Sequence, residues 1–341
     1  MTSRVCVVIA TALFGVVPHA HDADLIAQRR VVIAELSAKN QLWEVGGESE
    51  ALVTPNRMVL VDTLLIVTDP REPRIDALDV RTGRTVWQYA RVGGGPNEIR
   101  QPFLASWHPR GVAVVDNQNR RVLLLSMQGR PLAEASVPGG LFVAGLCGLK
   151  GGDLVVHVPD PNGSGLILFG LGKAAPRNLG DPFPVSSLSI SERSVDLAST
   201  ESMGGDHCLV TRRIADGFAL IHSNGTGVAG QFIERLTQRR LLPPPQIRDT
   251  SQLPIQFGLR GTVTGNTAVV RFGGKTRCAF KCLDLYALPD MSYQRTIQLD
   301  MQLPIRMRDI VLAPGHIIVL GTRNDLPVIT AFSVPPSVVP R

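Results

Sequence analysis

The residue types that most often catalyse reactions are dispersed along this 341-residue chain. It contains seven histidines and 29 acidic residues, but no Gly-x-Ser-x-Gly element, no His-Glu-x-x-His motif and no Gly-rich phosphate loop that opens a helix. His157 and His222 lie inside predicted strands, where a histidine is more often a packing residue than a ligand. The sequence therefore leaves the catalytic residues unknown, and we expect neither a resident metal nor a cofactor.

Arginines close to predicted loops are the strongest indication of a binding site. They lie near loops that would share one face of a repeated β-fold, with one more in a Gly-rich connector. The loop residues are Arg74, Arg120, Arg213, Arg277 and Arg323, and the connector residue is Arg100. Guanidinium groups bind carboxylates and phosphates through paired N–H donors, so we predict an anionic ligand or partner at this face. Because arginine is common in this chain and loops are polar, chance placement is the alternative.

Asp116 ends a predicted strand and precedes the polar turn Asn117–Asn119. Aspartates in such turns accept hydrogen bonds from nearby backbone amides, and we predict that role for Asp116. A calcium-binding or acid–base role is the alternative.

The cysteines suggest one disulfide. Cys278 and Cys282 are the only closely spaced pair. Four residues of extended strand span about 13 Å, so a Cys278–Cys282 bond requires a loop that folds back on itself. We expect Cys147 and Cys208 to be small buried apolar residues.

The N-terminus has the features of an export signal. Arg4 precedes an apolar run over residues 5–17, which ends near Ala20 or Ala23. This run is too short for a comfortable membrane span. We therefore predict a periplasmic or secreted protein in an oxidising compartment, with a buried N-terminal strand as the alternative.

The net charge of +6 does not indicate nucleic-acid binding. The basic residues are scattered and form no cluster beside exposed aromatic residues, as a nucleic-acid groove would require. We expect a solvated surface of mixed charge, no nucleic-acid partner, no membrane span after signal removal and a monomeric chain. The partner would be an unknown small molecule or an envelope protein.

Short apolar strands separated by Gly, Pro and Asn turns recur along the rest of the chain. Equivalent strands return about every 40–60 residues, which is typical of a ring of four-stranded blades. We predict an all-β fold, a six-bladed β-propeller with a short N-terminal helix. The predicted segments are a signal peptide at 1–23, a helical segment at 24–40, the propeller at 41–335 and a Pro-rich tail at 336–341.

The last repeat lacks a strand, because Pro335 and Pro336 cannot donate to a ladder. The segment Leu42–Val45 precedes the first complete repeat and has no repeat of its own. We predict that it closes the ring as the outer strand of the last blade, with Trp43 packed beside that blade. This pairing would remove two unpaired sheet edges.

Two segments resemble known families. Residues 113–122 resemble an NHL repeat, and residues 93–102 (GGGPNEIRQP) are similar to a connector of bacterial six-bladed propellers of the NHL/TolB-like kind, with Asn97 and Ile99 departing from the usual Gly and Phe. This resemblance implies six blades in an exported protein, and most members of that family have no assigned activity. Residues 77–87 resemble one quinoprotein repeat, but a quinoprotein needs a ring of such repeats, so we interpret Trp87 as a packing residue between blades.

These observations predict a binding or scaffold module of the cell envelope, whose ligand is unknown and for which the loop arginines favour an anion. The alternative is a hydrolase or lyase that acts on a sugar, lactone or peptide at the central channel. A redox quinoprotein ranks third. The fold does not decide among these classes, because propellers carry many different sites.

Overall fold

The computed structural model describes most of the chain beyond the N-terminal segment. The residues described are 25–27, 31–49, 52–158, 165–171, 175–179, 197–201, 207–212, 218–222, 227–230, 234–236, 258–264, 266–272, 281–288, 290–299 and 305–334. The predicted signal peptide lies outside them, and so does the Pro-rich tail. Among the described residues, no helix is long and apolar enough to cross a membrane.

Almost all described elements are strands, and apart from β2 and β3 they pair antiparallel with their neighbours in sequence order within each sheet. The first sheet contains β4 (Arg57–Val61), β5 (Leu64–Asp69), β6 (Arg74–Asp79) and β7 (Thr85–Tyr89). The second contains β8 (Pro102–His108), β9 (Gly111–Asp116), β10 (Arg121–Leu125) and β11 (Pro131–Ser136). The third contains β12 (Gly145–Gly148), β13 (Asp153–His157), β14 (Leu166–Gly170) and β15 (Arg177–Asn178).

Three more sheets follow in the same manner. The fourth contains β16 (Leu197–Glu201), β17 (His207–Arg212), β18 (Phe218–His222) and β19 (Gly227–Gly230). The fifth contains β21 (Gly258–Thr264), β22 (Thr267–Phe272), β23 (Cys282–Ala287), β24 (Tyr293–Leu299) and the added β2 (Val32–Leu36). The last contains β25 (Arg306–Ala313), β26 (His316–Arg323), β27 (Leu326–Ser333) and β3 (Gln41–Gly46). A separate pair joins β1 (Leu25–Ala27) to β20 (Glu234–Leu236).

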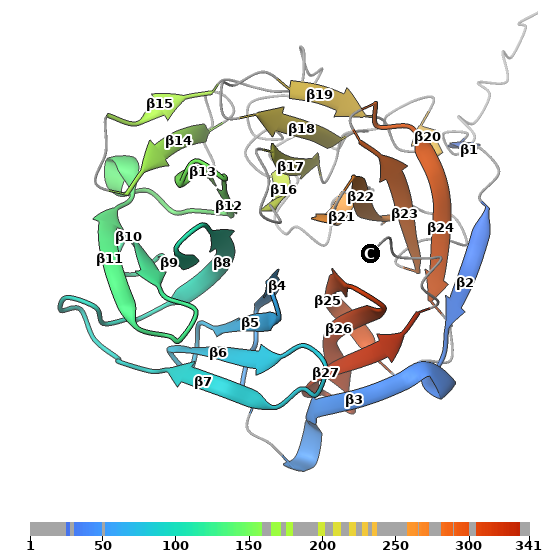
Figure 1. Ribbon diagram of the computed structural model, residues 1–341, viewed down its shortest axis with the longest axis horizontal. Coiled ribbons are helices and arrows are strands. Elements are labelled where there is room, and N and C mark those ends of the chain that lie inside the picture. The colour runs from blue at the N-terminus through green and yellow to red at the C-terminus, as the bar shows by residue number, and fades with distance from the viewer. Residues whose placement is uncertain are drawn as a thin grey trace, which may run out of the picture.

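The sheets follow one another around a central axis, with the first strand of each sheet nearest the axis and the later strands farther out (Figure 1). The central strands β5 and β9 are buried along their whole length, whereas the outer strand β11 alternates between half-buried and exposed positions. Val, Ile and Leu fill the buried strands because these are packed on both faces by neighbouring sheets. The core therefore consists of apolar layers between adjacent sheets.

The expectation of six four-stranded blades is only partly met, since the described residues form five sheets of four strands, one of five strands and a separate two-stranded pair. The predicted N-terminal helix is wrong for the described residues. β2 lies in place of the helix and pairs in parallel with β24. Val31 and Val32 belong to a β-branched run that favours strand, and the free edge of β24 supplies the hydrogen-bond partners. The described helical elements are three 3₁₀ turns at Ala38–Asn40, Gly47–Ser49 and Pro138–Gly140.

The N-terminal strand β3 pairs antiparallel with β27, with Val45 opposite Ile329 and Trp43 opposite Ala331. Trp43 extends from there to the first sheet, where its indole N–H donates to the Val80 carbonyl at 3.2 Å. The same ring covers Gly83, where any β-carbon would collide with it. The last and first sheets are therefore joined through an outer-strand tryptophan.

Trp87 repeats this contact one sheet farther along. It lies on β7, its indole N–H donates to the Met127 carbonyl at 2.9 Å, and its ring covers Gly129 in the β10–β11 turn. The prediction of an inter-blade packing role for Trp87 is confirmed. The two glycines have φ of +71° and +74°, so both the turn and the overlying ring exclude a side chain there.

The expected burial of Cys147 and Cys208 is confirmed, but the expectation missed that they form a disulfide between β12 and β17, with a Cα–Cα distance of 5.9 Å. Both residues are fully buried in an apolar cluster between the third and fourth sheets. The two cysteines are 61 residues apart in the sequence, so no local pattern indicated that the ring places them on facing strands. Cys282 is also disulfide-bonded, but Cys278 lies outside the described residues, so the Cys278–Cys282 pairing stays a prediction.

A buried arginine links two further sheets. Arg271 on β22 donates to the carbonyls of Met307 and Arg308 at 3.3 and 3.2 Å. Burial lowers the pKa of Arg271 to about 10, which leaves it charged at neutral pH. This contact joins the fifth sheet to the last one through backbone oxygens.

Candidate functional site

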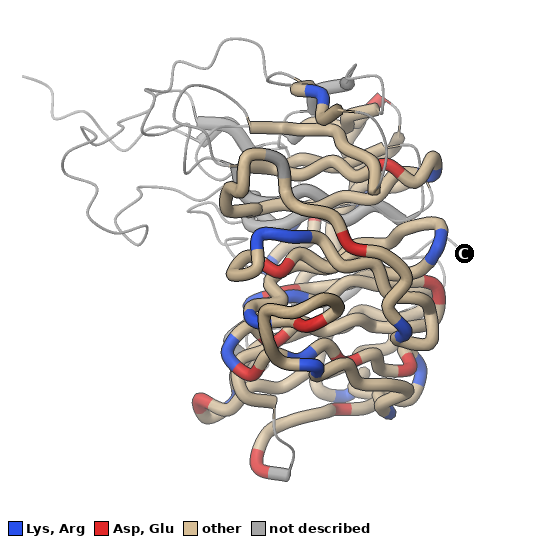
Figure 2. The backbone as a smooth tube through the Cα atoms, turned by 90° about the vertical axis from the view of Figure 1, so that its left-hand side faces the viewer, with Lys and Arg blue, Asp and Glu red and all other residues tan. Residues whose placement is uncertain are grey.

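One face of the ring is formed by the connectors between consecutive sheets and by the turns between the second and third strands. We call it the connector face, defined by connectors 90–101 and 137–144 and turns 69–74 and 116–121. Acidic and basic residues alternate along the backbone without large regions of one charge (Figure 2). The connector face is therefore distinguished by how its charges are paired rather than by their number.

Asp116 organises this face where β9 ends. Its carboxylate accepts hydrogen bonds from the backbone N–H groups of Arg100 and Gln101, both at 2.9 Å, and from the Asn119 side chain at 2.7 Å. It also accepts the backbone N–H of Asn119 at 3.3 Å, so the predicted bond to a turn amide is confirmed. Asp116 is fully buried, and its acceptor sites are occupied by the protein itself.

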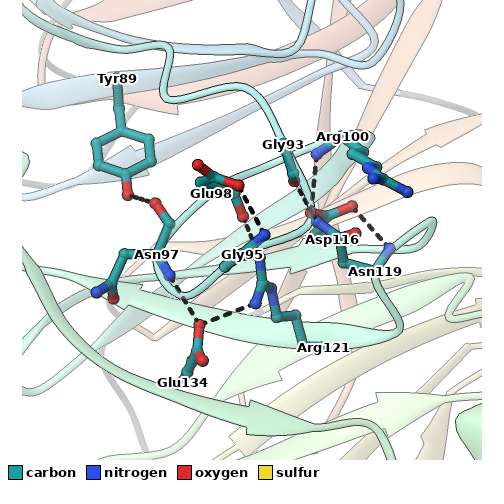
Figure 3. A network of polar contacts seen from close by, with 10 residues as sticks. All are labelled: Tyr89, Gly93, Gly95, Asn97, Glu98, Arg100, Asp116, Asn119, Arg121 and Glu134. Atoms are coloured by element: carbon teal, nitrogen blue, oxygen red, sulfur yellow. Dashed lines mark hydrogen bonds and ion pairs between the residues drawn. The ribbon is translucent and has the colours of Figure 1, made fainter.

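Arg121 holds the Gly-rich connector in place (Figure 3). Its guanidinium donates to the Gly95 carbonyl at 2.7 Å and to the Glu98 carbonyl, and it forms an ion pair with Glu134 at 3.1 Å. Glu134 also accepts the backbone N–H of Asn97 at 3.1 Å. The connector is thus fixed by charge-assisted bonds to both adjacent strands of the second sheet.

The connector is also stabilised by hydrogen bonds within itself and to Tyr89. The Glu98 carboxylate accepts the Gly95 N–H at 2.6 Å, and a β-carbon on Gly93 would collide with that carboxylate. The Tyr89 hydroxyl donates to the Asn97 carbonyl, and burial raises the pKa of Tyr89 above its usual value. The glycines therefore allow the Glu98 carboxylate to lie close to the backbone, and these contacts hold the connector in one conformation.

The predicted arginines are in different electrostatic states. Arg74 forms ion pairs with Glu72 at 3.0 Å and Asp76 at 2.9 Å. Arg323 forms one with Glu44 at 2.6 Å. Both guanidinium groups are therefore already paired with carboxylates of the chain. Arg213 and Arg277 lie outside the described residues.

Arg100 and Arg120 differ from this group. Both are exposed, and among the described residues neither guanidinium has a hydrogen-bond or ion-pair partner. Arg120 has a φ of +54°, an uncommon conformation for a residue with a side chain. The connector face thus carries two unpaired guanidinium groups on loops that are held in place by hydrogen bonds to neighbouring strands.

Sequence reasoning missed Arg121, because it selected Arg120 as the counterpart of Arg74. The pairing registers show otherwise, since Asp69 lies opposite Arg74 and Asp116 lies opposite Arg121. The spacing Asp-x₄-Arg occurs in both turns and could have identified the equivalent residues. Arg120 is an additional cation in the second turn.

The described residues include no group of three or more His, Cys, Asp or Glu side chains that could hold a metal ion. His157 is buried at the end of β13, and burial lowers the pKa of His157 to about 4. His207 and His222 are opposite each other on β17 and β18, with ring centroids 4.1 Å apart.

No protein-family model and no curated protein matches the chain. Solved structures do match it over most of their lengths. A protein described as exported, from Bacteroides fragilis NCTC 9343, is 10% identical, with a TM-score of 0.53 and coverage of 90% of this chain and 94% of the other. Virginiamycin B lyase from Staphylococcus aureus is 9% identical, with a TM-score of 0.51 and coverage of 86% and 100%. The RRP9 WD40 repeats are 10% identical, with a TM-score of 0.52 and coverage of 90% and 99%.

The fold is a β-propeller. At these identities the likeness concerns the fold alone, and the three proteins differ widely in what their names describe. The site of this propeller must therefore be argued from its own residues, of which the connector face of the second sheet offers the most specific set.

Proposed function

We propose that this chain is an exported β-propeller that serves as a binding or scaffold module of the cell envelope, periplasmic or secreted, and that it binds an anionic ligand or partner at the connector face. The observation that carries this proposal is the pair of exposed, unpartnered guanidinium groups of Arg100 and Arg120 on a rigid loop system. Guanidinium groups favour carboxylates and phosphates because their N–H donors match such groups in pairs.

The architecture in this proposal has six blades. The five-stranded sheet counts as one of the six blades, in which β2 is an addition to a four-stranded unit. The pairing of β3 with β27 closes the ring, because it joins the N-terminal strand to the last sheet. This arrangement agrees with the NHL/TolB-like resemblance of residues 93–102 and with a monomeric chain.

The Cys147–Cys208 disulfide supports export. Structural disulfides form and persist in oxidising compartments and are rare in reducing ones. The apolar run at residues 5–17 supports the same location. The hydrolase or lyase alternative rests on the fold alone, since propellers include a lyase among the structural neighbours.

Calorimetry with a polyanion tests this proposal. We expect polyglutamate to bind the wild-type protein with an affinity that falls as salt concentration rises. The Arg100→Gln/Arg120→Gln variant should bind on the order of tenfold more weakly, since two charge-assisted contacts are lost. Arg84→Gln/Arg130→Gln is the matched control, because it removes two exposed arginines from turns outside the connector face. Equal losses in the two variants would contradict the proposal.

A further inference from the structure

The turn that carries Arg120 also positions an exposed apolar segment. The Asn117 side-chain amide donates to the Val143 carbonyl at 3.0 Å and accepts the Val143 N–H at 2.9 Å, and both bonds are buried. Val143 is fully buried, whereas Leu141 and Phe142 immediately before it are 49% and 51% exposed. The Asn117 clamp therefore fixes the backbone from which these two apolar side chains project.

Phe142 is also supported at its base. Its ring lies against Phe103, with centroids 5.4 Å apart and an interplanar angle of 60°. Phe103 belongs to β8 and is itself partly buried against the core between the second and third sheets. One half of Phe142 is thus packed in a defined orientation, and the other half remains available to a partner.

Arg120 lies beside this apolar pair. The Val137 N–H donates to the Arg120 carbonyl at 2.9 Å, and a β-carbon built on Gly140 would lie 3.6 Å from Arg120 Nη1. The guanidinium therefore passes over Gly140, the residue that precedes Leu141. Arg100 is tied to the same turn, because its backbone N–H is bonded to Asp116.

From these contacts we infer that Arg100, Arg120, Leu141 and Phe142 form one docking surface, the Arg–Phe surface, for an acidic segment of a partner protein that carries an apolar side chain. This inference rests on the proposed function and specifies the partner. Glutamate or aspartate carboxylates would pair with the two guanidinium groups, while an apolar side chain of the segment would cover Phe142. A rigid, preformed surface loses little entropy when it binds such a segment.

A protein segment fits this surface better than an anionic membrane does. The corresponding turns of the first and last sheets carry exposed carboxylates, at Glu72 and Asp325. A planar anionic membrane that lay across the turns of all these sheets would meet the carboxylates of Glu72 and Asp325. A single segment needs to contact only the Arg–Phe surface.

Fluorescence anisotropy with three labelled hexapeptides tests the inference on the full-length protein. The first peptide has four glutamates around a Phe-Leu centre, the second has the same glutamates around Gly-Gly, and the third has four lysines around Phe-Leu. We expect the first to bind about tenfold more tightly than the second, because burial of one aromatic group contributes roughly this factor. The third should not bind.

Three variants separate the surface from general destabilisation. Arg120→Asn keeps a residue type that tolerates the positive φ of this position, so it should fold normally and lose affinity for both acidic peptides. Phe142→Ser should reduce binding of the first peptide to the level of the second. Val86→Ser removes an apolar side chain that is 55% exposed on β7, and it should leave all binding unchanged.

The outcomes distinguish this inference from the proposed function. Equal binding of both acidic peptides, with no effect of Phe142→Ser, would overturn the inference and leave anion binding intact. Failure of every acidic peptide and of polyglutamate would overturn both. Binding to phosphatidylglycerol vesicles that depends on Phe142, without peptide binding, would also overturn the inference in favour of a membrane surface.

Discussion

The first and second sheets share the same stabilising contacts but expose different charges. In each sheet an aspartate ends the second strand, at Asp69 or Asp116, and an arginine lies opposite it at the start of the third strand. Each sheet also receives a tryptophan from its neighbour, over Gly83 or Gly129. These shared contacts therefore stabilise the sheets, so a binding surface that is specific to the second sheet must come from residues that differ between the two.

The difference lies in the turns and the connectors. The first turn, residues 69–74, contains two arginines and two carboxylates, and Glu72 pairs with Arg74 at 3.0 Å, so its charges balance. The second turn has Arg120 one residue before the structural Arg121, and the Arg120 guanidinium has no hydrogen-bond or ion-pair partner among the described residues. The second turn, residues 116–121, thus contains two arginines against a single carboxylate, and its uncompensated positive charge can attract an anion.

The largest effect is expected from removing the shared carboxylates. Asp69 accepts the Thr54 N–H at 2.7 Å and two amides of its own turn, which resembles the role of Asp116. Asp69→Ala and Asp116→Ala should each lower the free energy of unfolding by about 4 kcal/mol, because several partly buried N–H groups lose their acceptor at once. Urea denaturation measures this loss. As a control, Asp290→Ala at an exposed position should change the free energy of unfolding by less than about 1 kcal/mol. A similarly small loss in Asp116→Ala would show that the carboxylate does not stabilise the turn.

The third sheet provides the next comparison, since β13 ends with His157 where the other two sheets have an aspartate. The pKa of His157 is lowered to about 4 in the folded protein by burial, against 6.5 for an ordinary histidine. The unfolded chain therefore binds a proton below pH 6.5 that the folded chain does not bind until about pH 4. The free energy of unfolding should therefore decrease, by at most about 3 kcal/mol, as the pH is lowered from 6.5 to about 4.

The measurement is the free energy of unfolding at about pH 7.5 and about pH 4.5, from urea denaturation. The difference between the two values should shrink in His157→Gln, which removes the titrating group. An identical pH dependence in the variant would show that other groups account for the slope.

The two tryptophans test whether neighbouring sheets are joined equivalently. Trp43→Ala and Trp87→Ala each remove an inter-sheet ring contact and one indole hydrogen bond. Both rings are only partly buried, so we expect each loss of unfolding free energy to be about 2 kcal/mol. A loss at Trp87 with none at Trp43 would separate the two contacts, and the proposed ring closure would then lack support from Trp43.

The smallest effect should come from adding a counter-charge to the second turn. Gln118 is exposed two residues before Arg120, so Gln118→Glu places a carboxylate near the Arg–Phe surface without altering the core. Stability should change by less than about 0.5 kcal/mol, while the affinity for polyglutamate falls a few-fold. Gln128→Glu, in the exposed β10–β11 turn, is the control. Equal affinities for the two variants would contradict the assignment of the surface.

The strand pattern and the Gly-rich connector allowed the ring of sheets to be predicted from the sequence, because buried strands have continuous apolar runs. The packing role of Trp87 and the turn bonding of Asp116 followed from local residue types. The helix at 24–40 was wrong because β2 finds its partner at the edge of β24, some 260 residues away in sequence. Such a long-range pairing leaves no local signal.

The candidate site shows the same limit. The arginines were identified by residue type and loop position, but the ion pairs of Arg74 and Arg323 depend on Glu72, Asp76 and Glu44. Glu44 is far from Arg323 in the sequence, and only the pairing of β3 with β27 brings them together. The Cys147–Cys208 disulfide was missed for a similar reason. Local sequence therefore indicated which residues could act but not which of them are already neutralised.

Hydrogen–deuterium exchange mass spectrometry of the wild-type protein, with and without polyglutamate, tests the central claim most directly because it locates the bound anion. We predict slower exchange in residues 93–101, 116–121 and 137–143, and unchanged exchange in the β6–β7 and β10–β11 turns at 79–85 and 125–131. This protection should be absent in Arg100→Gln/Arg120→Gln. Protection of the β6–β7 and β10–β11 turns instead, or the same protection in the double variant, would contradict the claim that the connector face of the second sheet binds the anionic partner.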